Sequence, residues 1–105
     1  MGRDRRRYSR VGVELNVALE GAGSHWLAKT VDLSPYGVKV ALPATSASLT
    51  TGTRVELKLA VPDQNSALSL GASVVRTDPD GIALNFIALG AQRFARLKGL
   101  VDSLL

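Results

Sequence analysis

The sequence contains no cysteine and one histidine, His25, among its 105 residues. The absence of cysteine excludes disulfides, thiolate metal ligands and thiol nucleophiles. A single histidine excludes a metal site built from several histidines, and no nucleophile–base pair stands out elsewhere. We therefore expect a protein that is not an enzyme and that holds no metal or cofactor.

Long apolar runs are absent as well. None approaches the ~18 residues that a membrane helix needs. The arginine-rich N-terminus lacks the apolar core of a secretory signal, so we expect a cytoplasmic protein with no membrane insertion. Apolar residues make up 46% of the chain and charged residues 21%. That composition is ordinary for one folded domain of this length.

The positive charge is confined to one end of the chain. Residues 1–10 carry five arginines against Asp4, whereas the rest of the chain carries eight basic and eight acidic side chains. A neutral body with a cationic arm indicates an anionic partner that is met at one place. We expect residues 1–10 to be a flexible basic arm and residues 11–105 to be a single domain.

A period of two predicts strands through most of the body. In residues 11–20 the side chains of Val11, Val13, Leu15, Val17 and Leu19 alternate with small or polar residues. Such alternation is typical of a half-buried strand. Similar patterns, separated by turn residues, predict further strands at residues 26–33, 37–42, 54–61, 68–74 and 82–86.

The last segment changes to a helical period. Phe94, Leu97, Val101 and Leu104 are spaced three and four apart, which predicts a helix over about residues 91–104 with one apolar face. Six short strands and a closing helix favour a mainly β fold, a six-stranded antiparallel (split) β-barrel with a C-terminal α-helix. The pattern leaves a monomer and a homodimer both open.

Two polar clusters carry the chemistry. The first is the arginine-rich stretch that contains Arg6 and Arg10, and the second is the turn from Asp32 to Gly37. If the first two strands form an antiparallel hairpin, Asp32 returns beside Arg10. Within the turn, Pro35 fixes φ and Gly37 permits a positive φ.

These side chains suit a ligand that carries both phosphate and guanine. Guanidinium groups such as that of Arg10 bind phosphate oxygens and the O6/N7 edge of guanine. The Asp32 carboxylate can accept from guanine N1 and N2, Ser34 can donate or accept, and Gly37 lets backbone approach a ligand. The alternatives are a solvated arginine tail, and turn capping by Asp32 and Ser34.

Arg6-x-x-x-Arg10 followed by Asp32-x-Ser34-x-x-Gly37 resembles the paired RxxxR and (D/N)xSxxG signature of PilZ domains. The resemblance extends to residues 71–76, to residues 81–86 and to the closing helix. PilZ domains are known as bacterial receptors for cyclic di-GMP that are built on a six-stranded barrel. The resemblance implies that Arg6 and Arg10 bind phosphate and guanine, while Asp32, Ser34 and Gly37 line the opposite wall.

Three further arginines, Arg5, Arg7 and Arg76, are candidate ligand contacts. One departure from the family pattern is Ala83, where many members have a second glycine.

The expected function is that of a cyclic di-GMP receptor or adaptor whose arm and surface change on binding and signal to a protein partner. Two alternatives are a PilZ-like protein-interaction domain and a small nucleic-acid-binding barrel. Aromatic residues make up only 5% of the chain, too few for the stacking platform of the latter.

Overall fold

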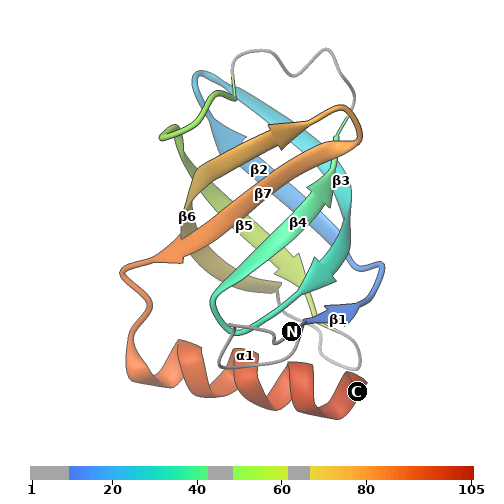
Figure 1. The fold of residues 1–105 in the computed structure, drawn as a ribbon. Coiled ribbons are helices and arrows are strands. Elements are labelled where there is room, and N and C mark those ends of the chain that lie inside the picture. Colours follow the sequence, from blue (N-terminus) through green and yellow to red (C-terminus); the bar gives the residue numbers. More distant parts are fainter. Residues whose placement is uncertain (1–9, 43–48, 62–66) are drawn as a thin grey trace, which may run out of the picture.

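The strands form one closed antiparallel sheet. A computed structural model describes residues 10–42, 49–61 and 67–105. In these residues the elements are β1 (Val11–Gly12), β2 (Asn16–Gly21), β3 (Ser24–Leu33), β4 (Gly37–Ala41), β5 (Arg54–Ala60), β6 (Ala67–Asp78), β7 (Gly81–Ile87) and α1 (Ala91–Leu104). The strand order is β1-β3-β2-β5-β6-β7-β4, and β4 also pairs with β3, which closes β2 to β7 into a barrel (Figure 1). The predicted six-stranded barrel with a C-terminal helix is confirmed.

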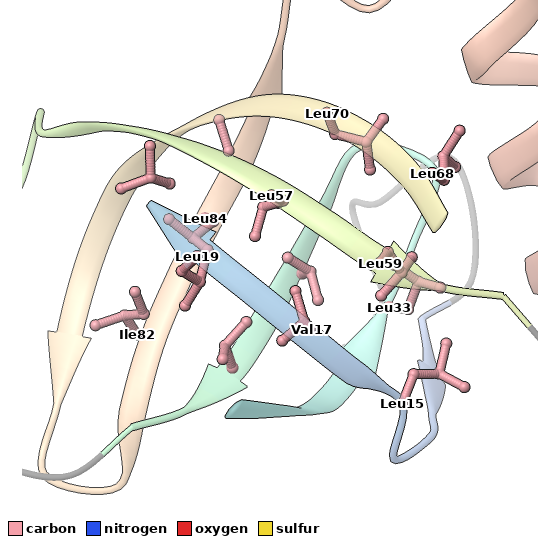
Figure 2. Packing of buried hydrophobic residues seen from close by; sticks show 14 of the residues in the cluster. Leu15, Val17, Leu19, Leu33, Leu57, Leu59, Leu68, Leu70, Ile82 and Leu84 are labelled. Carbon is pink, nitrogen blue, oxygen red and sulfur yellow. The ribbon is translucent and has the colours of Figure 1, made fainter. Parts of the chain in front are cut away.

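The barrel interior is filled by one face of every strand. On β5 the buried residues Val55, Leu57 and Leu59 alternate with exposed ones, as a strand with one face in the core requires. Figure 2 shows the leucines of β2, β5, β6 and β7 converging on the same interior. Period-two patterning therefore specifies both the strands and the side that each turns inward.

The predicted strand over residues 11–20 is divided into β1 and β2. Between Gly12 and Asn16 the chain advances four residues, while the partner strand β3 advances only three, from Asp32 back to Lys29. The hydroxyl of Thr30 occupies the break, because it accepts from the Leu15 amide at 2.9 Å and donates to the Val13 carbonyl. The apolar alternation continues across the break, so the sequence does not reveal it.

Helix α1 lies across the end of the barrel at which β1 is found (Figure 1). Its Leu97 and Val101 are almost fully buried against the core, whereas the Phe94 ring packs on Tyr36 with centroids 5.5 Å apart. The helix is thus held both by the core and by the turn between β3 and β4. Among the described residues, no helix is long and apolar enough to cross a membrane.

Three predicted features fall wholly or partly outside the described residues. They are the basic arm with Arg5, Arg6 and Arg7, most of the loop expected at residues 43–53, and the turn expected at residues 62–66.

Candidate functional site

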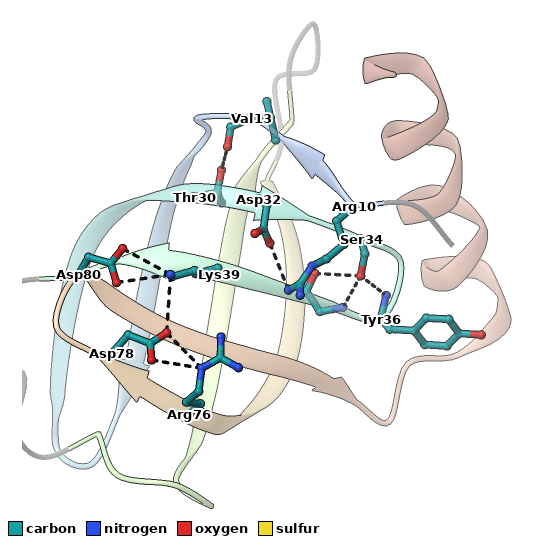
Figure 3. Close-up of polar contacts among 11 residues, drawn as sticks. Arg10, Val13, Thr30, Asp32, Ser34, Tyr36, Lys39, Arg76, Asp78 and Asp80 are labelled. Atoms are coloured by element: carbon teal, nitrogen blue, oxygen red, sulfur yellow. Dashed lines mark hydrogen bonds and ion pairs between the residues drawn. The ribbon is translucent and has the colours of Figure 1, made fainter. Parts of the chain in front are cut away.

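The end of the basic arm meets the end of β3. Val11 pairs with Leu33 and Gly12 with Asp32, so β1 and β3 place Arg10 beside the Asp32 side chain. Arg10 Nη2 lies 3.1 Å from Asp32 Oδ1, and both side chains are about 70% buried, with exposed fractions of 30% and 27% (Figure 3). The juxtaposition of Arg10 and Asp32 is therefore the one that the hairpin predicts.

The Arg10–Asp32 ion pair does not satisfy all the hydrogen-bonding groups of the two side chains. Among the described residues, Arg10 Nε has no hydrogen-bond partner, and Asp32 Oδ1 has none apart from its ion pair with Arg10 Nη2, although both atoms are shielded from solvent. Buried polar atoms are normally hydrogen-bonded, and each unmade bond is costly. A ligand that offers an acceptor to the guanidinium and a donor to the carboxylate would satisfy both atoms.

A β-bulge at Val31 turns Asp32 toward this site. The register of β3 against β4 shifts between Thr30 and Asp32, so Val31 is an extra residue on β3. Thr30 faces the barrel interior and Val31 is exposed. With regular alternation Asp32 would share the inward face of Thr30. The bulge instead places the carboxylate outside the barrel and returns Leu33 to the core.

The turn between β3 and β4 is organised by Ser34. Its Oγ accepts from the amides of Tyr36 and Gly37, each at 3.2 Å, and its own amide donates to the Gly37 carbonyl at 2.9 Å (Figure 3). Ser34 is buried. The serine therefore caps the turn, which is the alternative role that its sequence position allowed.

Gly37 is required for a different reason from the one that its place in a turn suggests. Among the described residues the glycines with positive φ are Gly23 and Gly52, so Gly37 does not use that freedom. A Cβ on Gly37 would instead lie under 3.0 Å from the Leu84 carbonyl oxygen. The positive φ that glycine permits at this position is not adopted. Gly37 lets β7 approach β4 closely.

A second bulge, at Val75, turns Arg76 outward on the neighbouring strands. The β6–β7 register shifts between Val74 and Arg76, and Arg76 then pairs with Ala83. Ala83 also pairs with Lys39 of β4, and Lys39 pairs with Asp32 of β3. Across four strands the outer face thus carries a row, which we call the charged row: Asp32, Lys39, Ala83 and Arg76.

Acidic residues of the β6–β7 hairpin bind the two cations of this row. Arg76 Nε donates to both carboxylate oxygens of Asp78 at 3.1 and 3.2 Å. Lys39 Nζ lies 3.6 Å from Asp78 Oδ2 and 3.4 Å from Asp80 Oδ1 (Figure 3). Arg76 is therefore placed three strands from Asp32 and is paired with carboxylate.

The structure brings together Arg10, Asp32, Ser34 and Gly37, and it sets Arg76 at the far end of the charged row. Lys39 was missed by the sequence analysis. Its position two residues after Gly37 on a strand is the signal that could have found it, because alternate residues share a face. Within the described part of the chain, no group of three or more histidine or acidic residues could hold a metal.

Comparison with protein-family models gives a match to the family described as "PilZ domain", over residues 4–103. No curated protein gives a significant match.

Comparison with solved structures gives several barrels of the same shape. The inhibitor of motility MotI/DgrA of Bacillus subtilis superposes with a TM-score of 0.78 at 20% identity, covering 95% of this chain and 51% of that one. The PilZ domain of CeSA from a cellulose-synthesizing bacterium gives 0.75 at 21% identity, covering 91% and 97%. The PilZ domain of Escherichia coli YcgR, solved with c-di-GMP, gives 0.76 at 18% identity, covering 96% and 92%.

These likenesses establish the fold. The chain spans about half the length of MotI/DgrA and nearly all of the two isolated domains.

Proposed function

The chain belongs to the PilZ domain family, and from that premise we propose that it is a non-enzymatic receptor for cyclic di-GMP. The observation that carries the proposal is the partly buried Arg10–Asp32 pair, in which Arg10 Nε has no hydrogen-bond partner among the described residues and Asp32 Oδ1 has none besides Arg10 Nη2. A guanine nucleotide offers the acceptor and the donors that these atoms need. The solved YcgR domain with c-di-GMP shares the fold and supports the same choice of ligand.

The proposed roles follow the chemistry of each side chain. Arg6 and Arg10 bind a phosphate and the O6/N7 edge of guanine, because a guanidinium donates paired hydrogen bonds. Asp32 accepts from guanine N1 and N2. Ser34 holds the turn in shape and presents its backbone to the ligand. Gly37 contributes no side chain of its own to that surface.

Arg5, Arg7 and Arg76 are further proposed contacts. Arg5 and Arg7 flank Arg6 in the sequence. Arg76 lies on the charged row, and it would exchange Asp78 for a phosphate or a base when the ligand binds. An arginine also stacks on flat bases, so Arg76 could be satisfied by either part of the nucleotide.

Ligand binding has to replace the contacts between Arg10 and Asp32, at least in part, with contacts from each residue to the ligand. Each charge-assisted hydrogen bond contributes about 1.5–3 kcal/mol, and each residue of the arm that is ordered costs about 1–2 kcal/mol. Several contacts to the two phosphates and two guanines of cyclic di-GMP are therefore needed. We propose that these contacts change the conformation of the arm, and that a protein partner in the cytoplasm reads the resulting surface of protein and nucleotide.

Titration calorimetry with cyclic di-GMP tests the receptor. We expect Arg10→Ala and Asp32→Ala each to lower affinity at least tenfold, because each removes charge-assisted hydrogen bonds. The matched controls are Arg54→Ala and Glu20→Ala, which remove the same charges from β5 and β2, at positions whose cross-strand partners lie outside the turn. Both controls should bind as the wild type does.

Two results would contradict the proposal that this chain is a cyclic di-GMP receptor. One is the absence of wild-type binding. The other is loss of affinity with Arg10→Ala combined with unchanged or tighter binding with Asp32→Ala, which is the behaviour of a plain polyanion or nucleic-acid binder. Limited proteolysis of the arm tests the conformational part, and a cleavage rate that saturating ligand leaves unchanged would count against it.

A further inference from the structure

Lys39 is the one cation of the charged row that the proposed ligand contacts do not include. It is the direct cross-strand neighbour of Asp32, and neighbouring strands lie only about 4.7–4.9 Å apart. Its side chain has an exposed fraction of 20%. A nucleotide seated between Arg10 and Asp32 that extends over β4 therefore meets Lys39 before it reaches Arg76 (Figure 3).

The residues next to Lys39 on the outer face of the barrel are small. Gly37 precedes it by two residues on the same face of β4, and Ala83 is its partner on β7. Ile82 and Leu84 point into the core, so the Ala83 methyl group points outward. Neither neighbour obstructs a flat ligand that lies across β4 and β7.

The charge of Lys39 is at present satisfied by the β6–β7 hairpin. Its Nζ lies 3.6 Å from Asp78 and 3.4 Å from Asp80. Asp78 is mostly buried, with an exposed fraction of 26%, and it also binds Arg76, whereas Asp80 is 72% exposed. Exposed ion pairs are weak, so the Asp80 contact is the one that yields to another anion.

We propose that Lys39 is a further phosphate contact of the site and that Asp80 is an internal competitor that lowers the affinity for the ligand. The proposal rests on the cyclic di-GMP receptor argued above. When a phosphate approaches, it replaces Asp80 on Lys39, while Asp78 keeps the ammonium group aimed across the row. The carboxylate of Asp80 opposes the ligand because it occupies Lys39, the cation that the phosphate would bind.

A double-mutant cycle measured by calorimetry with cyclic di-GMP tests this pair. We expect Lys39→Met to lower affinity about tenfold, which corresponds to about 1.4 kcal/mol. We expect Asp80→Asn to raise affinity about threefold, and the double variant to bind no better than Lys39→Met. The control Glu20→Gln removes an equal charge from β2 and should leave affinity unchanged.

The outcomes separate this inference from the receptor itself. If the wild type does not bind, both proposals are overturned. If the wild type binds but Lys39→Met and Asp80→Asn bind equally well, only the role of Lys39 is overturned. A gain from Asp80→Asn that persists in the Lys39→Met background would show a general field effect and would also overturn it. Should Lys39→Met fail to fold, Lys39→Gln and the exposed Asp80→Asn carry the same test.

Discussion

Substitution of Gly37 by alanine should weaken the barrel itself, whether or not a ligand is bound. The new Cβ would lie under 3.0 Å from the Leu84 carbonyl oxygen and 3.2 Å from Asn85 Oδ1. The first neighbour is backbone of β7, which cannot rotate away as a side chain can. Strands β4 and β7 therefore have to separate at the Gly37–Asn85 pair.

The cost can be worked from these contacts. Overpacking of this kind costs about 1–3 kcal/mol, and weakening one backbone hydrogen bond of the ladder adds about 1 kcal/mol. A total of about 2–4 kcal/mol corresponds to a fall in melting temperature of roughly 10–30 °C for a domain of this size. Thermal unfolding followed by circular dichroism or calorimetry measures the fall directly.

Two other glycines provide the comparison. Gly81→Ala should behave like Gly37→Ala, because its Cβ would meet the Val40 carbonyl oxygen on the same pair of strands. Gly99→Ala should instead raise stability by up to about 1 kcal/mol, since it lies in α1 and its added Cβ would meet nothing within 4 Å beyond the adjoining backbone of the helix. A Gly37→Ala protein that has the melting temperature of the wild type and loses only ligand affinity would refute this reasoning.

Two further predictions concern the elements around the site. Thr30→Val should lower stability by about 1–3 kcal/mol, because the Leu15 amide loses its hydroxyl partner, whereas Thr30→Ser should recover most of the loss. Denaturant unfolding measures both, and equal stability of the valine and serine variants would contradict the role of the hydroxyl. Tyr36→Ala should remove about 0.5–1.5 kcal/mol of ring packing on Phe94 and speed amide exchange in α1, while exchange in β5 stays unchanged. Unaltered exchange in α1 would contradict the link between turn and helix.

Much of the fold could be predicted from the alternation of apolar side chains. The two-residue period predicts the strands, and the change to a helical period predicts the closing helix. The antiparallel hairpin predicts that Arg10 lies near Asp32. The bulge at Val31 could not be predicted, because an extra residue on one strand shows only when its partner strand is known. The break between β1 and β2 was hidden for the same reason.

The candidate site was predicted less completely. Lys39 was missed because its relevance depends on which strands are neighbours, and β4 lies between β3 and β7 only in the closed barrel. The packing role of Gly37 was missed as well, since the close approach of Leu84 comes from a strand distant in sequence. Contacts between distant segments thus account for both omissions.

The bulges at Val31 and Val75 separate two kinds of sequence constraint. On each strand the extra residue shifts the register by one. The buried leucines and valines of the strand still point into the barrel, and the residue directly after the extra one points outward. Residues 32 and 76 can then be exchanged for others without disturbing the hydrophobic interior. Substitutions at these two positions therefore change the outer face of the barrel while its apolar interior keeps its register.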